Sequence, residues 1–337
     1  MVVSLDPASM PSASGTHVSG DRFEALFDQA DELAVMPELT AGIATNTTNS
    51  TELSLYQQWY NRGVWLAQVG QPAAAIASYR KSLSLNPHYV KAWYNQANQF
   101  ARLGLYQTAL CSYAKALKLN PNLFIAWYSR GRLHCQLGDH QQGLNDYKRA
   151  LVLQPNFYPA WYYQAEAFMQ LGQYEAAVTS FGQVLVLKPD LYQIWYRRGV
   201  ALYKLGRYAD AQASYERALD IKPELMAAWH SRGNTLVRQG QLQAAVASYD
   251  RAIALQPHLA NAWYGRGKAL AYLGRYPEAI TSYDRVLKLQ PDFPNARHCR
   301  QLALCHLMPH LVLQHRWLLS HLKRARESMT TAPRQVA

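Results

Sequence analysis

One spacing constrains this chain more than any other feature. Tryptophan recurs every 34 residues, and seven of the nine tryptophans lie on that grid. The grid positions are Trp59, Trp93, Trp127, Trp161, Trp195, Trp229 and Trp263. A fixed period of this length is typical of a repeat array, in which each copy is one small structural unit. The sequence therefore predicts tandem copies rather than one or two ordinary globular domains.

The fourth copy, residues 158–191, shows what each unit should look like. Trp161 and Phe168 belong to an apolar stripe at helical spacing. Gly172 then ends the helix, because glycine adopts the left-handed conformation of a helix end at little cost. A second apolar stripe follows, and Pro189 ends it because proline cannot continue a helix. Each copy is therefore predicted to be an antiparallel pair of short helices.

The other copies repeat these signals. The turn glycines are Gly70, Gly104, Gly138, Gly172, Gly206, Gly240 and Gly274, and the closing prolines are Pro87, Pro121, Pro155, Pro189, Pro223, Pro257 and Pro291. Four residues after each tryptophan stands Gly63, Ala97, Gly131, Ala165, Gly199, Gly233 or Gly267. A glycine inside a helix costs up to ~1 kcal/mol in propensity, so a close approach of the two helices is expected there. Replacing a grid tryptophan by alanine is expected to cost about 3–5 kcal/mol through cavity formation.

These residues at these offsets resemble the tetratricopeptide repeat. The seven copies would span residues 56–89, 90–123, 124–157, 158–191, 192–225, 226–259 and 260–293. The resemblance implies an all-α fold, an α-solenoid of seven helix hairpins in a right-handed superhelix with C-terminal capping helices. It also implies that the first helices line a concave groove. Strings such as LGRYADAQASYERALDIKP are similar to repeats of bacterial type, cyanobacteria included.

The two ends depart from the repeat pattern. Residues 1–55 form an acidic leader with eight acidic residues against Arg22, a net charge of −7, whereas the remainder carries +19. Within the leader, segment 21–34 places Phe23, Leu26 and Phe27 at helical spacing, and a flexible linker follows. Residues 294–329 are expected to supply capping helices, and residues 330–337 a disordered tail.

No set of residues meets the spacing of a catalytic, cofactor or metal site. His306 and His310 lie four residues apart beside Cys305 and could share a metal, but an interface on a capping helix explains them as well. His134 falls where other copies place an apolar packing residue. No phosphate-binding glycine loop follows a strand. We therefore expect a protein that is not an enzyme and holds no cofactor or metal.

The compartment is inferred from what the chain lacks. No apolar run is long enough to span a membrane, and the first residues do not read as a signal peptide. The four cysteines show no paired spacing, which fits a reducing compartment. A cytoplasmic location is predicted.

The resemblance places the binding residues on the first helices. One residue after each tryptophan stand Tyr60, Tyr94, Tyr128, Tyr162, Tyr196, His230 and Tyr264. Other expected groove residues are Lys91, Asn98, Arg102, Arg132, Arg197, Lys204, Asn234, Arg238 and Lys268. Tyrosine gives a wide contact area at small entropic cost, and cations select acidic ligands. We expect a protein partner with an acidic, partly apolar segment, bound by a scaffold that assembles a larger complex. At the single sites, the tyrosines could instead only cover the edge of the core.

Three other binding targets fit parts of the sequence. A basic, tyrosine-rich groove could bind RNA, although no base-reading module appears. Trp317, Leu318 and Lys323 could bring a C-terminal helix to a membrane surface, although a capping helix explains them as well. The leader could occupy the groove through Phe23, Leu26 and Phe27. Heat-shock chaperones are not expected, because the family's carboxylate clamp needs a lysine directly after the tryptophan and none occurs there.

Overall fold

The computed structural model describes residues 53–307, and this part of the chain is helical without strands. The predicted leader helix and linker lie outside the described residues. So do the second capping helix, with Trp317, and the tail. Among the described helices, none is long and apolar enough to cross a bilayer.

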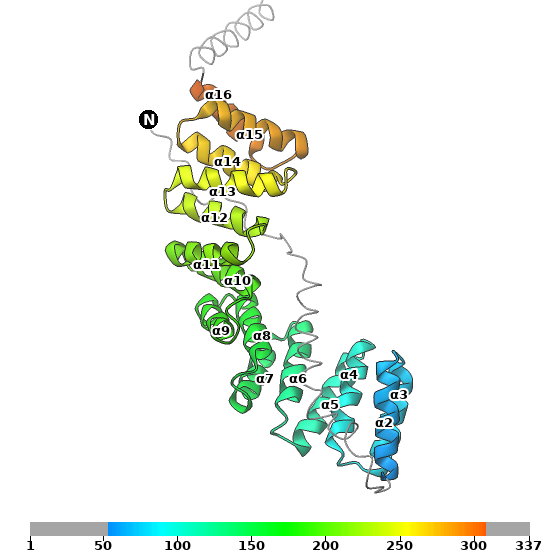
Figure 1. Ribbon diagram of the computed structural model, residues 1–337. Coiled ribbons are helices and arrows are strands. Elements are labelled where there is room, and N and C mark those ends of the chain that lie inside the picture. Colours follow the sequence, from blue (N-terminus) through cyan, green and yellow to red (C-terminus); the bar gives the residue numbers. More distant parts are fainter. Residues whose placement is uncertain (1–52, 308–337) are drawn as a thin grey trace, which may run out of the picture. The chain divides into compact units, whose positions relative to one another are not determined.

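The described chain divides into two compact units, which meet in sequence between Leu205 and Gly206. Figure 1 shows the antiparallel helix pairs of each. Unit one contains α2 (Leu55–Gln68), α3 (Pro72–Leu85), α4 (Val90–Arg102), α5 (Tyr106–Leu119), α6 (Phe124–Gln136), α7 (His140–Leu153), α8 (Tyr158–Gln170), α9 (Tyr174–Leu187) and α10 (Tyr192–Lys204). Unit two contains α11 (Tyr208–Ile221), α12 (Met226–Arg238), α13 (Leu242–Leu255), α14 (Ala260–Tyr272), α15 (Tyr276–Leu289) and α16 (Ala296–Leu307).

The turn inside each hairpin is made by the predicted glycine. All seven turn glycines have φ between 70° and 86°, the left-handed region that a side chain rarely enters. After α8, the Gly172 N–H donates to the Met169 carbonyl at 3.2 Å and the Gln173 N–H to the Phe168 carbonyl at 2.9 Å. These bonds satisfy carbonyls that the helix end would leave open. The sequence therefore located every helix–helix turn correctly.

Inside the hairpins, a tyrosine of the second helix lies against a glycine of the first. A Cβ built on Gly63 would stand 2.5 Å from Tyr79 Cε1, and one on Gly233 would stand 2.7 Å from Tyr249 Cε1. Tyr79 and Tyr249 are both fully buried. The glycine four residues after the tryptophan in these copies is therefore explained by the predicted close approach, because the ring occupies the space that a side chain would need.

The grid tryptophans do not lie in this core. None of the seven is fully buried, so part of each indole already contacts water. From the second copy on, the indole N–H donates to the carbonyl of the proline six residues before, as Trp127 does to Pro121 at 2.8 Å. The tryptophan thus fastens its hairpin to the turn that precedes it. The expected cost of about 3–5 kcal/mol for replacing a grid tryptophan by alanine stays a prediction, in which this hydrogen bond is lost together with the packing of the ring.

The closest helix approach yields a test of packing. Gly143 on α7 faces Gly131 on α6, and a Cβ at Gly143 would overlap Cys135 Sγ and lie 3.0 Å from the Gly131 carbonyl oxygen. We expect Gly143→Ala to lower the free energy of unfolding by about 1–3 kcal/mol, because an added methyl group forces shifts in a packed core. Urea denaturation measures this.

A second variant is the control for that substitution. Cys135→Ala combined with Gly143→Ala recreates the alanine pair that the first copy carries as Ala67 and Ala75. The double variant should therefore recover part of the lost stability. A double variant that unfolds at the same urea concentration as Gly143→Ala alone would contradict the proposed overlap.

The tryptophan bond can be tested by a matched pair. Trp127→Phe keeps an aromatic ring but removes the N–H that donates to Pro121. Trp59→Phe makes the same change at the one grid tryptophan of the described chain whose indole N–H donates to no carbonyl six residues before it. We expect Trp127→Phe to be more destabilising by about 1 kcal/mol, the net value of one hydrogen bond. Equal losses in urea titrations would show that the bond is not needed.

Candidate partner-binding face

Positions are counted from the grid tryptophan, which is position 0. The aromatic rings at +1 pack inside the hairpins. Tyr60 is 4% exposed, and its ring centroid lies 5.8 Å from that of Tyr79 on α3. Tyr264 is 5% exposed and lies 6.0 Å from Tyr283 on α15. The same pairing of first-helix and second-helix rings occurs for Tyr94, Tyr128, Tyr162 and His230. This differs from the expected open tyrosine lining, since a small residue at +4 lets the second helix come close enough to cover these rings.

The edges of these rings link one hairpin to the next. Asn95 on α4 donates to the Tyr60 hydroxyl at 2.9 Å, and the Tyr94 hydroxyl lies 3.4 Å from Ser129 Oγ on α6. In unit two, the Tyr264 hydroxyl lies 3.5 Å from Cys299 Sγ on α16. Burial raises the pKa of Tyr60, which therefore stays a neutral hydroxyl. Each contact joins a +1 residue to the +2 residue of the following copy, a 35-residue relation that the period itself could have revealed.

Three of the other expected binding residues are also used internally. Asn98 and Asn234 accept hydrogen bonds from the hydroxyls of Tyr113 at 2.6 Å and Tyr249 at 2.7 Å. Lys268 is 8% exposed, its ammonium lies 5.8 Å from the Tyr264 ring, and burial lowers its pKa. Their side chains therefore help to hold the hairpins together, and partner contact by them stays a prediction.

In unit one, the remaining predicted cations share one face of the first helices. The guanidinium of Arg132 on α6 lies 4.9 Å from the ring of Tyr163 on α8. This contact shows that consecutive first helices are neighbours. Arg197 on α10 lies 3.4 Å from Glu166 on α8. Arg102 and Lys204 are exposed at the ends of α4 and α10, and Lys91 is half-buried. We call the side chains at +2, +5 and +9 of α4, α6, α8 and α10, together with Lys91, the first-helix face.

The charge of this face is one-sided. Five cations from the predicted set lie on it, namely Lys91, Arg102, Arg132, Arg197 and Lys204. Among the described side chains at its positions, Glu166 is the one carboxylate, and Arg197 already pairs with it. Tyr163 on the same face is a half-buried ring that packs against Tyr128. Such a face suits a ligand that brings negative charge and some apolar surface.

The expected residues of unit two are less concentrated. Tyr196 belongs to α10 in unit one and is half-buried, as are His230 and Arg238 on α12. With Lys268 and Asn234 turned to internal contacts, Arg238 is the remaining cation of the predicted set in this unit. Unit one therefore carries most of the candidate surface.

A further set of arginines has a role that the sequence suggested only in part. These are the arginines three residues after a grid tryptophan, and their guanidinium groups lie over their own tryptophans, for example Arg130 at 4.7 Å from the Trp127 ring. Arg130 also donates to Asp146 Oδ1 at 2.6 Å. The head of Arg130 is thus fixed by an ion pair and an indole, and Asp146 is the acidic partner that the sequence analysis did not identify.

The residues with metal or acid–base character do not assemble into a site. His134 is half-buried, with Nε2 4.0 Å from Asp146 Oδ2. The His306 ring stacks on Tyr276 at 5.1 Å, and His310 lies outside the described residues. Within residues 53–307, no group of three or more histidine, cysteine, aspartate or glutamate side chains could hold a metal.

The geometry defines an α-solenoid of helix hairpins. A sequence model of the tetratricopeptide repeat family matches residues 60–124, 97–156, 128–190, 162–225 and 230–294, so the chain belongs to this family. Tetratricopeptide repeats generally mediate protein–protein interaction, and the proteins that carry them are typically non-catalytic. Among curated proteins, no sequence matches this chain.

Solved structures show the same fold at low sequence identity. The C-terminal part of a repeat protein from Cytophaga hutchinsonii is 16% identical, with a TM-score of 0.60 over 71% of this chain and 98% of that chain. YrrB, a TPR protein with an unusual peptide-binding site, is 23% identical, with a TM-score of 0.51 over 56% of this chain and 97% of that one. Naa15/Naa10 bound to HypK-THB is 18% identical, with a TM-score of 0.54 over 74% of this chain and 39% of that chain. These identities show the fold alone.

His230 gives a pH-dependent prediction. Burial lowers the pKa of His230 from the ordinary 6.5 to about 4, because the ring lies beside Tyr249, where water cannot fully hydrate its charged form. The unfolded chain therefore binds the proton first, so the contribution of His230 to stability is full above pH 6.5 and is lost as the pH falls towards 4. Between pH 7 and pH 5, the urea midpoint of the wild type should fall further than that of His230→Tyr, which carries the residue of the other copies. Parallel changes in the two midpoints would contradict the shifted pKa.

Proposed function

We propose that this chain is a non-catalytic scaffold whose first-helix face captures an acidic, partly apolar segment of a partner protein. The excess of cations over carboxylates on that face carries the proposal. Arg132 supports it further, because its guanidinium lies over Tyr163 and so offers a charge and an aromatic edge together.

The family and its structural relatives support the same class of function. YrrB is described with a peptide-binding site, and Naa15/Naa10 with a bound HypK domain. A scaffold of this kind would bring its partner into a larger complex. All four cysteines are free thiols, which suits action in the cytoplasm.

Binding of a defined probe tests the proposal. The probe is a fluorescein-labelled helical peptide of glutamate, leucine and phenylalanine, compared with versions that carry lysine for glutamate or serine for the apolar residues. We expect the acidic apolar peptide alone to bind, with affinity that falls as salt rises, since screening weakens exposed charge pairs. Arg132→Glu should weaken binding about ten-fold, because it places a like charge against the ligand. Fluorescence anisotropy is the measurement.

The control is Lys115→Glu, which makes the same charge change on the exposed side of α5 in the same unit. It should leave the affinity unchanged. Equal weakening by both variants would mean that net charge alone attracts the peptide. Single-stranded RNA serves as a counter-probe, and RNA binding near physiological salt that Arg132→Glu abolishes would favour a nucleic-acid function instead.

A further inference from the structure

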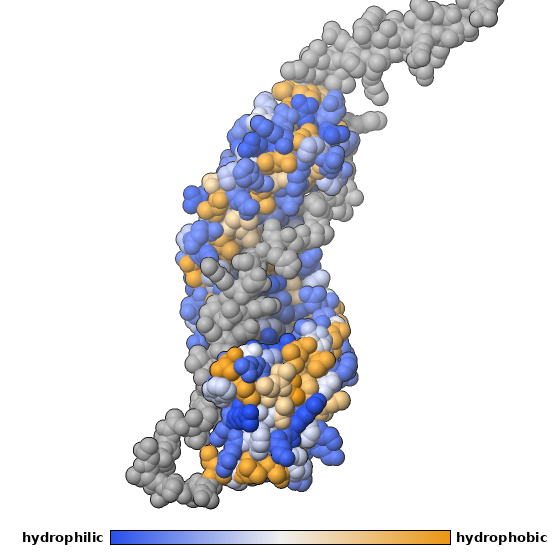
Figure 2. All heavy atoms as spheres, turned by 90° about the vertical axis from the view of Figure 1, so that its right-hand side faces the viewer, coloured by the Kyte–Doolittle hydropathy of each residue, from blue (hydrophilic) through white to orange (hydrophobic). Residues whose placement is uncertain are grey.

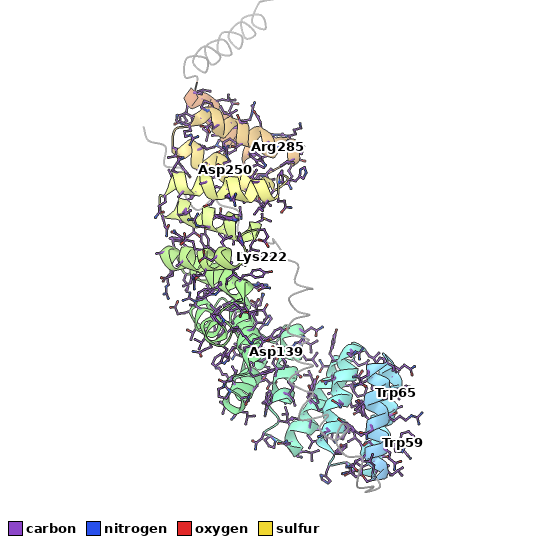
Figure 3. All side chains as sticks on the ribbon, viewed as in Figure 1. Trp59, Trp65, Asp139, Lys222, Asp250 and Arg285 are labelled. Carbon is purple, nitrogen blue, oxygen red and sulfur yellow. The ribbon has the colours of Figure 1, made fainter. Side chains whose placement is uncertain are left out.

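The first hairpin carries a stacking surface that no described part of the chain covers. Trp65, at +6 of α2, is 60% exposed, and Leu55 is 55% exposed. In every later copy of the array the +6 residue is buried, as for Leu133 and Thr235. Figure 3 marks Trp59 and Trp65 on α2, and Figure 2 shows exposed apolar residues over this hairpin. We call Leu55, Trp59, Arg62 and Trp65 the leading face.

The later copies show what such a face accepts. In unit two, Arg232 on α12 donates to Glu216 of the preceding α11 at 2.9 Å. Arg266 on α14 donates to Asp250 of the preceding α13 at 2.6 Å, and Arg300 on α16 pairs with Asp284 of α15. In these three cases the +3 arginine takes a carboxylate that directly follows a buried tyrosine of the preceding second helix. Arg130 in unit one differs, since it pairs with Asp146 of its own hairpin.

Arg62 is the equivalent arginine of the first copy. Its guanidinium lies 5.1 Å from the Trp59 ring, as the later arginines lie over theirs, and its side chain is exposed. In unit two, Arg232 and Arg266 also donate to a serine of their own hairpin, Ser248 and Ser282. Ser78 is the equivalent serine for Arg62. The leading face therefore has the features of a receiving face, and the described chain contains no helix before it to donate the carboxylate.

The acidic leader has the matching sequence. Phe27-Asp28-Gln29-Ala30 repeats the order of Tyr249-Asp250-Arg251-Ala252, with an aromatic residue, an acid and an alanine at the same offsets. About 20 residues separate segment 21–34 from the start of α2, and at up to ~3.3–3.6 Å per residue they can span a helix of that size. We propose that segment 21–34 packs on the leading face as a surrogate second helix, with Asp28 paired with Arg62 and the apolar side of the segment, to which Phe27 belongs, covering Trp65.

A second copy of the chain fits this face less well. Arg62 is the one charged residue of α2. Arg80 and Lys81 add two further cations on α3, and neither helix carries an acidic residue. Two leading faces brought together would therefore oppose like charges. The other end of the array offers α16, which also contains no acid. The leader, with eight acids against one arginine, is the part of the chain with the complementary charge.

Hydrogen exchange of the full chain tests the contact. In the variant Phe27→Ala with Asp28→Arg, we expect the amides of α2 to exchange about ten-fold faster than in the wild type, since a covering helix is lost. Glu38→Arg changes the leader's charge outside the segment and should leave α2 unchanged. Unaltered α2 exchange in the first variant would overturn the proposal. Faster exchange in α6 and α8 instead of α2 would overturn it by placing the leader on the first-helix face.

Charge reversal makes the test specific. Asp28→Arg and Arg62→Asp should each speed α2 exchange, and the two together should restore it, because the pair is rebuilt with its signs exchanged. Failure of the double variant to restore α2 protection would contradict the Asp28–Arg62 pair. Protection of α2 that rises with protein concentration, measured beside sedimentation, would show that a second copy covers the face and would overturn the proposal.

Discussion

The array depends on one contact, the tyrosine ring of a second helix lying against a glycine of the first. Where the ring of Tyr79 meets Gly63, no side chain fits between the helices. The two backbones therefore come close enough for the hairpin to form a single packed layer. The propensity lost by a glycine within a helix is offset by a buried ring of far larger apolar area.

This contact also decides which side chains remain for binding. A second helix held so close to the first covers the +1 rings, and their hydroxyls then reach the next copy rather than a ligand. Tyr60 illustrates this, with its ring on Tyr79 and its hydroxyl bonded by Asn95. The binding surface is thereby shifted to longer side chains further along the first helix, of which Arg132 is the best placed. Cations on a rigid aromatic layer give selectivity for charge with little ordering cost.

The fold was predictable because its determinants are local and repeated seven times. Gly172 fixes a turn through its own backbone, and the period carries that inference to every copy. Exposure was harder to predict, since whether Tyr128 is covered depends on Tyr147 and Phe157, which come from other helices. A residue that breaks the repeat pattern could be interpreted only once the structure showed what the usual residue at that position contacts. Asp146 is an example, since serine stands at the equivalent position of the six other copies.

The two ends of an array follow from the same packing rule and differ in how they satisfy it. At the C-terminal end of the described chain, α16 keeps the small buried Ala296 and Ala303 and supplies Arg300 to Asp284, so it completes the last hairpin as a further first helix would. At the other end, the exposed Gln58 stands where later copies bury an alanine or, in the fifth copy, an isoleucine, and the exposed Trp65 stands where they bury alanine, leucine, threonine or glutamine. The exposed Trp65 and Arg62 are the features that the proposed packing of the acidic segment would use, the first by covering its ring and the second by pairing with a carboxylate.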